Sequence, residues 1–88
     1  MQFLHYRCQA GQNDQIIVTL SSQARVLLLD NYNFAAYKAG NNYRYSGGWA
    51  TRSPVHLGVP HAGNWHVAVD LEGRAGAVQA GVRVARAA

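Results

Sequence analysis

Two segments of the chain, residues 54–59 and 64–70, have large apolar side chains at alternate positions. The link between them is Pro60-His61-Ala62-Gly63, with Gly where a three-residue hairpin loop favours a left-handed residue. In the register that opposes position 60 to position 64, every inward position is apolar, whereas a slip by one residue buries His56 and His66. The pattern therefore predicts a β-hairpin, whose inward residues are Val55, Leu57, Val59, Trp65, Val67 and Val69.

Other short runs also have the composition of β-strands. Residues 15–20 are rich in β-branched side chains and predict a strand. Residues 3–7 are expected to form the first strand and residues 77–84 the last, whose inward residues are Val78, Ala80, Val82 and Val84. Residues 25–30 are apolar on both faces, which fits a strand covered on both sides or a helix fragment. The short length of that run favours the strand.

One short helix is expected around residues 35–38, capped by Asn31 or Asn33 and ended by Gly40. The chain then returns to an extended form that bends or bulges at Gly47-Gly48. Short strands separated by Gly-rich turns predict an all-β fold, a small antiparallel β-sandwich that is jelly-roll-like and has one short helical segment. We expect one domain over residues 1–84 and a flexible tail over residues 85–88.

The composition sets limits on this domain. Its 88 residues suit a single domain with a modest core. Only 14% of the residues are charged, which favours self-association into a homo-oligomer. The net charge is +4, and no acid occurs from position 31 through position 69, so an anionic partner is favoured locally. Nucleic acid is disfavoured as a partner because the chain has no dense basic run.

Cysteine usage and hydropathy indicate a cytoplasmic protein. Cys8 is the single cysteine, so an intrachain disulfide is impossible, and its surroundings in the sequence suggest inert packing. The N-terminal residues do not have the pattern of a signal peptide, and no apolar run reaches membrane-spanning length. We therefore expect no membrane association.

Histidines spaced by five residues raise the question of a metal site. In the predicted hairpin, His56 and His66 are a diagonal pair on the outer face, but His61 lies in the turn and Asp70 is one step too far. Zinc needs a third and usually a fourth ligand, so we predict no metal site and no cofactor.

No catalytic signature is present. The serines lack a nucleophile elbow, and Cys8 lacks a histidine partner. Of the four acids, Asp70 and Glu72 can share one strand face, a pairing that is common by chance. The Gly-Arg-Ala-Gly sequence at 73–76 resembles a backbone-clamping loop, but a plain turn explains it better. We therefore predict a protein that is not an enzyme, and rank a small hydrolase or metal-dependent enzyme last.

The segment from 32 to 49 carries six of the nine aromatic residues and no acid, and four asparagines lie within it or directly before it, at positions 31, 33, 41 and 42. Amphipathic rings beside Asn and Arg suit a binding face. We take Tyr43, Arg44, Tyr45, Trp49 and Arg52 as the candidate residues for binding a small ligand or protein partner. Two alternatives stay open: the rings cover a small core, or they are buried between copies of a homo-oligomer.

The chain also resembles a known bacterial family. The resemblance rests on Asn33-Phe34, Tyr43-Arg44-Tyr45 and Gly47-Gly48, and above all on the run from Trp65 to Leu71 with the glycines that follow. This family is domain of unknown function 1883, and the likeness runs from about position 3 to position 84. It implies a compact β-sandwich, sometimes alone and sometimes joined to a Toll/interleukin-receptor-like domain. It carries over no catalytic or ligand-binding residue.

Overall fold

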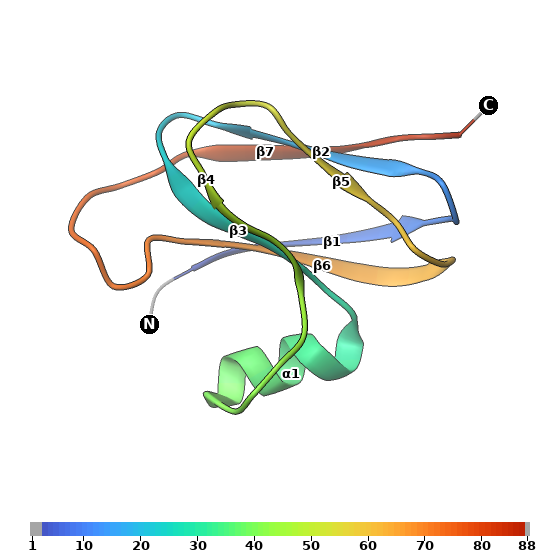
Figure 1. Cartoon of the computed structure of the whole chain (residues 1–88), viewed down its shortest axis with the longest axis horizontal. Coiled ribbons are helices and arrows are strands. Elements are labelled where there is room, and N and C mark those ends of the chain that lie inside the picture. The colour runs from blue at the N-terminus through green and yellow to red at the C-terminus, as the bar shows by residue number, and fades with distance from the viewer. Residues whose placement is uncertain (1–2, 88) are drawn as a thin grey trace.

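The computed structural model describes residues 3–87, which form seven strands and one helix in three layers (Figure 1). One sheet has the strand order β1-β6-β3-β4, the second has the order β5-β2-β7, and α1 covers the outer face of the first sheet. The elements in chain order are β1 (Leu4–Ala10), β2 (Gln15–Leu20), β3 (Ala24–Leu29), α1 (Asn31–Ala39), β4 (Ser46–Ala50), β5 (Val55–Gly58), β6 (Gly63–Asp70) and β7 (Ala80–Ala85). The predicted all-β sandwich with one short helix is confirmed.

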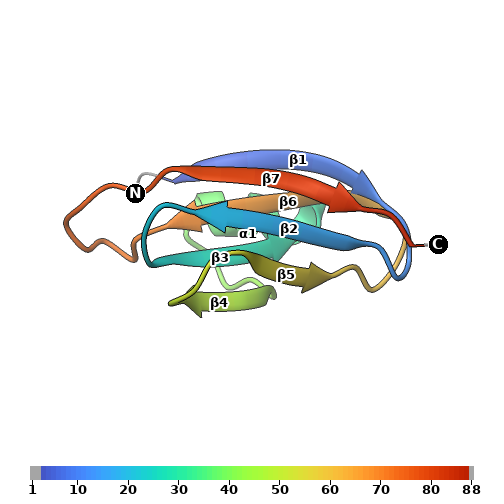
Figure 2. The same ribbon diagram turned by 90° about the horizontal axis from the view of Figure 1, so that it is seen from above.

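Every connection except the one through α1 carries the chain from one sheet to the other. Strands β1, β2 and β3 therefore alternate between the two sheets, as strands do in a jelly roll, and all strand pairs are antiparallel. Figure 2 shows the two sheets stacked, with β1 beside β7 along one side and β4 beside β5 along the other.

The predicted hairpin of 54–59 with 64–70 is wrong. Strand β5 pairs with β2, and β6 lies between β1 and β3 in the other sheet. The predicted inward residues nevertheless face the core: Leu57, Val59, Trp65, Val67 and Val69 are buried, and Val55 packs against them. Alternation determines which face of a strand is buried, but two strands that face each other across a sandwich show the same alternation as two neighbours in one sheet.

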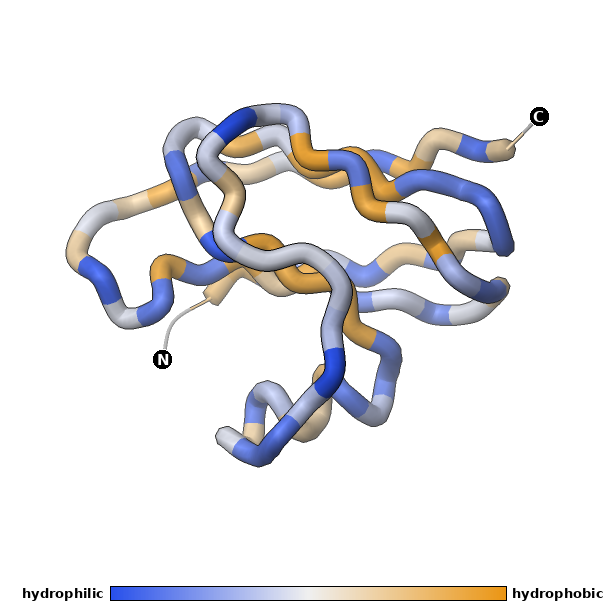
Figure 3. Tube along the Cα trace, viewed as in Figure 1, coloured by the Kyte–Doolittle hydropathy of each residue, from blue (hydrophilic) through white to orange (hydrophobic). Residues whose placement is uncertain are grey.

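The main core lies between the two sheets. It contains the inward residues of β2, β3, β5 and β6, and the partly buried Val82 and Val84 of β7 pack against it. Hydrophobic stretches follow the strands, and hydrophilic stretches gather at the turns and around α1 (Figure 3). Cys8 belongs to the margin of this core, and burial raises the pKa of its thiol, as expected for inert packing.

Strand β3 is apolar on both faces because both faces are covered. Val26 and Leu28 point into the sandwich, whereas Leu27 and Leu29 pack against Phe34 and Tyr37 of α1. The expected strand is therefore confirmed, and the helix is longer than the pattern indicated.

The ends of α1 follow standard capping chemistry. Asp30, rather than Asn31 or Asn33, is the N-cap, and its carboxylate accepts a hydrogen bond from the backbone N–H of Asn33 at 2.8 Å. Gly40 has φ of 78°, as expected for a residue that ends a helix in the left-handed region.

The C-terminal residues differ from the predicted tail. Strand β7 continues to Ala85, and the Arg86 side chain and the Ala87 N–H both bond to Asp14, at 3.2 and 2.7 Å. Residue 88 lies outside the described residues. Among residues 3–87, no helix is long and apolar enough to cross a membrane.

Candidate binding surface

The structure divides the aromatic segment between core and surface. Phe34 and Tyr37 are buried under α1, and Tyr32 points away from the sheet with 80% of its surface exposed. Tyr43 and Trp49 are half-buried, and Tyr45 is 50% exposed. The core-covering alternative therefore holds for Phe34 and Tyr37, whereas Tyr32 and Tyr45 are accessible, as a binding face requires.

Three tyrosines form a row from the core to the solvent. The ring of Tyr43 meets Tyr37 edge-on at a centroid distance of 5.3 Å, and Tyr45 meets Tyr43 at 5.6 Å. Both distances lie within the range of favourable aromatic contacts. Because Tyr37 is buried, the contacts along this row restrict the position of the Tyr45 ring at the surface.

Trp49 lies on the edge strand β4, opposite Arg25 of β3. The Arg74 guanidinium sits 4.3 Å from the centroid of its ring, a cation–π distance. Arg74 comes from the turn after β6 and was not among the predicted residues. Nothing in the local sequence of either residue indicates this contact, because the turn and β4 are brought together only by the sheet order.

The two predicted cations are not neighbours. Arg44 precedes β4 and Arg52 follows it, so they flank the strand at opposite ends, and both are exposed. The backbone N–H of Arg44 donates to the side-chain oxygen of Asn33 at 2.8 Å, which ties the approach to β4 onto the helix. We call Tyr43, Tyr45, Trp49, Arg44, Arg52 and Arg74 together the β4 surface.

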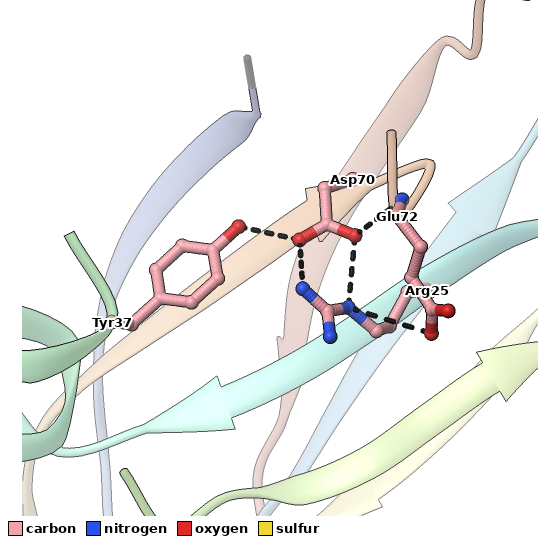
Figure 4. Close-up of polar contacts among 4 residues, drawn as sticks. All are labelled: Arg25, Tyr37, Asp70 and Glu72. Atoms are coloured by element: carbon pink, nitrogen blue, oxygen red, sulfur yellow. Dashed lines mark hydrogen bonds and ion pairs between the residues drawn. The ribbon is translucent and has the colours of Figure 1, made fainter. Parts of the chain in front are cut away.

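A buried ion pair lies beneath this surface (Figure 4). Arg25 donates from Nε and Nη2 to the two oxygens of Asp70, at 2.9 and 2.7 Å. The Tyr37 hydroxyl donates to one of these oxygens at 2.5 Å, and the backbone N–H of Glu72 donates to the other at 3.0 Å. Each oxygen of Asp70 therefore accepts two hydrogen bonds, and Asp70 is only 2% exposed.

The protonation of this network follows from its contacts. Burial by itself raises the pKa of Asp70, but the bonds from Arg25, Tyr37 and Glu72 outweigh burial and lower it. Burial and the bond to Asp70 raise the pKa of Tyr37. The bond to Asp70 raises the pKa of Arg25, and the nearby Tyr43 and Glu72 act in the same direction. The carboxylate has no free acceptor position, so this network anchors α1 and the turn after β6 to the sheet.

A second polar chain holds the other end of α1. His5 Nε2 and His66 Nδ1 are 2.9 Å apart, and His66 Nε2 donates to the Asn31 side-chain oxygen at 2.5 Å. The ring of Phe34 stacks on both imidazoles, at centroid distances of 4.1 and 4.4 Å. His66 Nε2 carries the proton that it donates to the Asn31 side-chain oxygen. In neutral His66 the other nitrogen, Nδ1, is therefore the acceptor, and it receives a hydrogen bond from His5 Nε2.

Both imidazoles favour the neutral form. Burial lowers the pKa of His5, and Arg7 and Lys38 lower it further. Burial, then His5, Arg7 and Lys38, lower the pKa of His66, which is 8% exposed, while Asp30 opposes them. The pair is thus suited to packing beneath Phe34.

The predicted diagonal pair of His56 and His66 is wrong, because the two residues lie in different sheets. His56 contacts Gln15 at 3.2 Å, whereas the partner of His66 is His5 of β1, which no local spacing indicated. Within residues 3–87, no three His, Cys, Asp or Glu side chains converge as a metal site would require.

An open cavity of about 920 Å³ adjoins the β4 surface at one end of the sandwich. The turn after β6 and the start of β1 form its walls, and Arg74 lies on its boundary. The lining is mainly apolar, with Leu4, Leu71 and Val78 among its residues. Arg74 therefore separates this cavity from Trp49.

The fold and the site together define the chain as a small all-β sandwich whose titratable groups are mostly engaged in internal contacts. The chain belongs to the family described as domain of unknown function (DUF1883), which it matches over residues 1–88, as its resemblance implied. No curated protein and no solved structure matches the chain significantly.

Proposed function

We propose that this domain is a non-enzymatic binding module that recognises a small ligand or protein partner through the β4 surface. One observation carries the proposal: Tyr45 is half exposed, yet its ring is held in place by a row of rings that begins in the core. A rigid aromatic ring at the surface gives contact area to a partner at a low entropic cost. Trp49, on strand β4, supplies a second ring four residues further along the chain.

The distribution of acids and histidines supports a role without catalysis. Asp70 is saturated by four hydrogen bonds, and Asp14 accepts from Gly11, Arg86 and Ala87. His66 uses both ring nitrogens in internal contacts. A general acid or base needs a titratable atom that is free to meet a substrate. We place this module in the bacterial cytosol, on the family resemblance and the single cysteine.

Substitutions on the β4 surface test the proposal. Tyr45→Ala and Trp49→Ala are each expected to weaken binding by about 1–3 kcal/mol, as the loss of a stacking anchor does, with little loss of stability. A thermal-shift screen of metabolites, glycans, oligonucleotides and peptides identifies a ligand through the rise in melting temperature. Titration of that ligand into each variant then gives the change in affinity.

Tyr32→Ala is the matched control, because it removes the same ring from an exposed position on α1 outside the β4 surface. Equal effects of Tyr32→Ala and Tyr45→Ala on affinity would refute the proposal. Unfolding of the Tyr45→Ala or Trp49→Ala variant would instead show that these rings are packing. A steep fall in affinity with added salt would indicate an anionic ligand.

Self-assembly is the second candidate function, and the low charge content favours it. In that case the β4 surface is buried between copies. Size-exclusion chromatography with light scattering separates the two: a monomer at tens of micromolar supports recognition of another molecule, and a dimer that Tyr45→Ala dissociates supports assembly.

A further inference from the structure

Strand β4 is the least protected sheet edge among the described residues. The two sheets end at four strands, β1, β4, β5 and β7. Strand β1 carries Arg7, β7 carries Arg83, and β5 lies between Pro54 and Pro60. Charged residues and prolines are the usual means by which proteins block edge pairing. Strand β4 is Ser-Gly-Gly-Trp-Ala and has neither.

The outer edge of β4 also has no strand partner among the described residues. On the opposite side of the sandwich, the Tyr6 hydroxyl of β1 bonds the Ala80 carbonyl of β7 at 2.8 Å and closes that side. Strand β4 ends the four-stranded sheet, and within residues 3–87 it pairs only with β3. A Cβ atom added at Gly48 would meet nothing within 4 Å, so the sheet face is uncovered at that position. At Gly47 an added Cβ would lie 2.2 Å from the Val26 carbonyl oxygen, so close pairing with β3 requires glycine there. The backbone of β4 is therefore accessible to another chain.

Charge identifies the kind of chain that fits this edge. Arg44 and Arg52 flank β4, and Arg74 lies on Trp49. Around β4 the sequence is free of acids from position 31 through position 69. Acidic side chains on an added strand would meet cations at both ends of β4, which favours both its approach and its register.

The same charges disfavour a second copy of this domain at this edge. Two β4 strands paired antiparallel about a two-fold axis at Gly48 would place Arg44 of one copy beside Arg52 of the other, because both lie four residues from Gly48. Like charges brought together in this way oppose association.

We propose, building on the binding role of the β4 surface, that β4 accepts an extended acidic peptide as an additional strand of the four-stranded sheet. The peptide backbone bonds to the free edge of β4. Its side chains contact the rings of Tyr45 and Trp49, and acids at its two ends pair with Arg44 and Arg52. This is recognition by β-strand addition, in which main-chain bonds give affinity and side-chain contacts give specificity.

Selection from a displayed library of random ten-residue peptides tests the charge preference. We expect the immobilised domain to enrich Asp and Glu near both ends of a core of β-branched or aromatic residues. The Arg44→Glu/Arg52→Glu variant is expected to bind these peptides at least about tenfold more weakly and to enrich basic residues instead. Both arginines are exposed, so circular dichroism should show an unchanged fold. Failure to enrich any peptide, or enrichment without acids, overturns the inference.

Backbone methylation tests the strand geometry. A selected peptide, resynthesised with N-methyl groups at alternate residues along one edge, is expected to bind at least about tenfold more weakly, whereas the peptide methylated along its other edge should keep its affinity. Equal binding of both methylated peptides overturns strand addition. If Trp49→Ala still abolishes that binding, the proposed β4 surface stands and only its mode of recognition is wrong. If Tyr45→Ala and Trp49→Ala leave binding unchanged, the proposed surface fails as well.

Discussion

The two faces of the four-stranded sheet are held by different chemistry. The inner face meets the second sheet through side chains that are mostly aliphatic, with Trp65 as the buried ring and Tyr6 packed at the margin. The outer face meets α1 through stacked rings and two polar chains, one centred on Asp70 and one on His66. Apolar burial is non-directional and tolerates changes of partner, whereas hydrogen bonds and ion pairs fix orientation. Small changes of charge or pH should therefore alter stability mainly through the outer face. The same face carries the contacts that hold the β4 surface.

The largest effect on stability is expected from a substitution on the inner face. Trp65→Ala removes the largest side chain of the core and should lower the free energy of unfolding by about 3–5 kcal/mol, enough to unfold so small a domain. Urea denaturation followed by circular dichroism measures this loss. A cost below about 1 kcal/mol for Trp65→Ala would contradict its place in the core.

Removing the Asp70 carboxylate from the outer face should lower the free energy of unfolding by nearly as much. Asp70→Asn leaves Arg25 without its carboxylate in a largely buried site, and we expect a loss of about 3 kcal/mol, measured by the same urea titration. Glu72→Gln is the matched control. Glu72 is 3.8 Å from Arg25 and is partly exposed, so its loss should cost less than about 1 kcal/mol. Equal costs for the two substitutions would mean that the buried network does not anchor α1.

A pH titration distinguishes the two faces more finely. The folded domain lowers the pKa of His5 and His66, so the unfolded chain binds more protons near their ordinary pKa of about 6.5. The free energy of unfolding should therefore be fully retained above that pH and decrease as the pH falls through it toward the lower folded pKa. Unfolding titrations between pH 7.5 and pH 5, roughly spanning that value, measure the slope.

The source of this slope can be assigned by substitution. His5→Gln/His66→Gln keeps side-chain hydrogen bonding but removes the titration, and should flatten the dependence. His56→Gln, on the exposed face of the other sheet, should leave it unchanged. A slope that persists in the double variant would show that other groups cause it.

The smallest effect concerns the contact between Trp49 and Arg74. A double-mutant cycle with Trp49→Phe and Arg74→Ala should give a coupling energy of about 0.5–1 kcal/mol, because the pair is partly exposed. Zero coupling would mean that Arg74 does not rest on the ring in solution.

The inner face was largely predictable from sequence, and the outer face was not. Alternation at 55–59 and 65–69 identified the buried residues correctly but gave the wrong strand partners, since burial of one face is compatible with either sheet. Gly40 was identified as the end of the helix because its chemistry is local. Arg25 with Asp70, His5 with His66 and Trp49 with Arg74 are each far apart in the chain. No pattern within a short window records such pairs, so Arg74 was missed and Asp70 was considered only as a metal ligand or acid.

Among the described residues, no two strands that follow each other in the chain pair through a tight turn. This topology has a consequence for how the domain folds. Strand β1 aligns Leu4 with Val69, and β2 aligns Leu20 with Ala80. Each pairing requires two segments that are distant in the chain to meet. The entropic cost of closing a long loop is therefore met before strand pairing contributes any stability. Such a topology folds on the slow side for its size, in milliseconds to seconds for typical all-β domains. A nascent chain cannot complete the three-stranded sheet before β7 has been synthesised, and until then β2 and β5 are exposed to pairing with other chains.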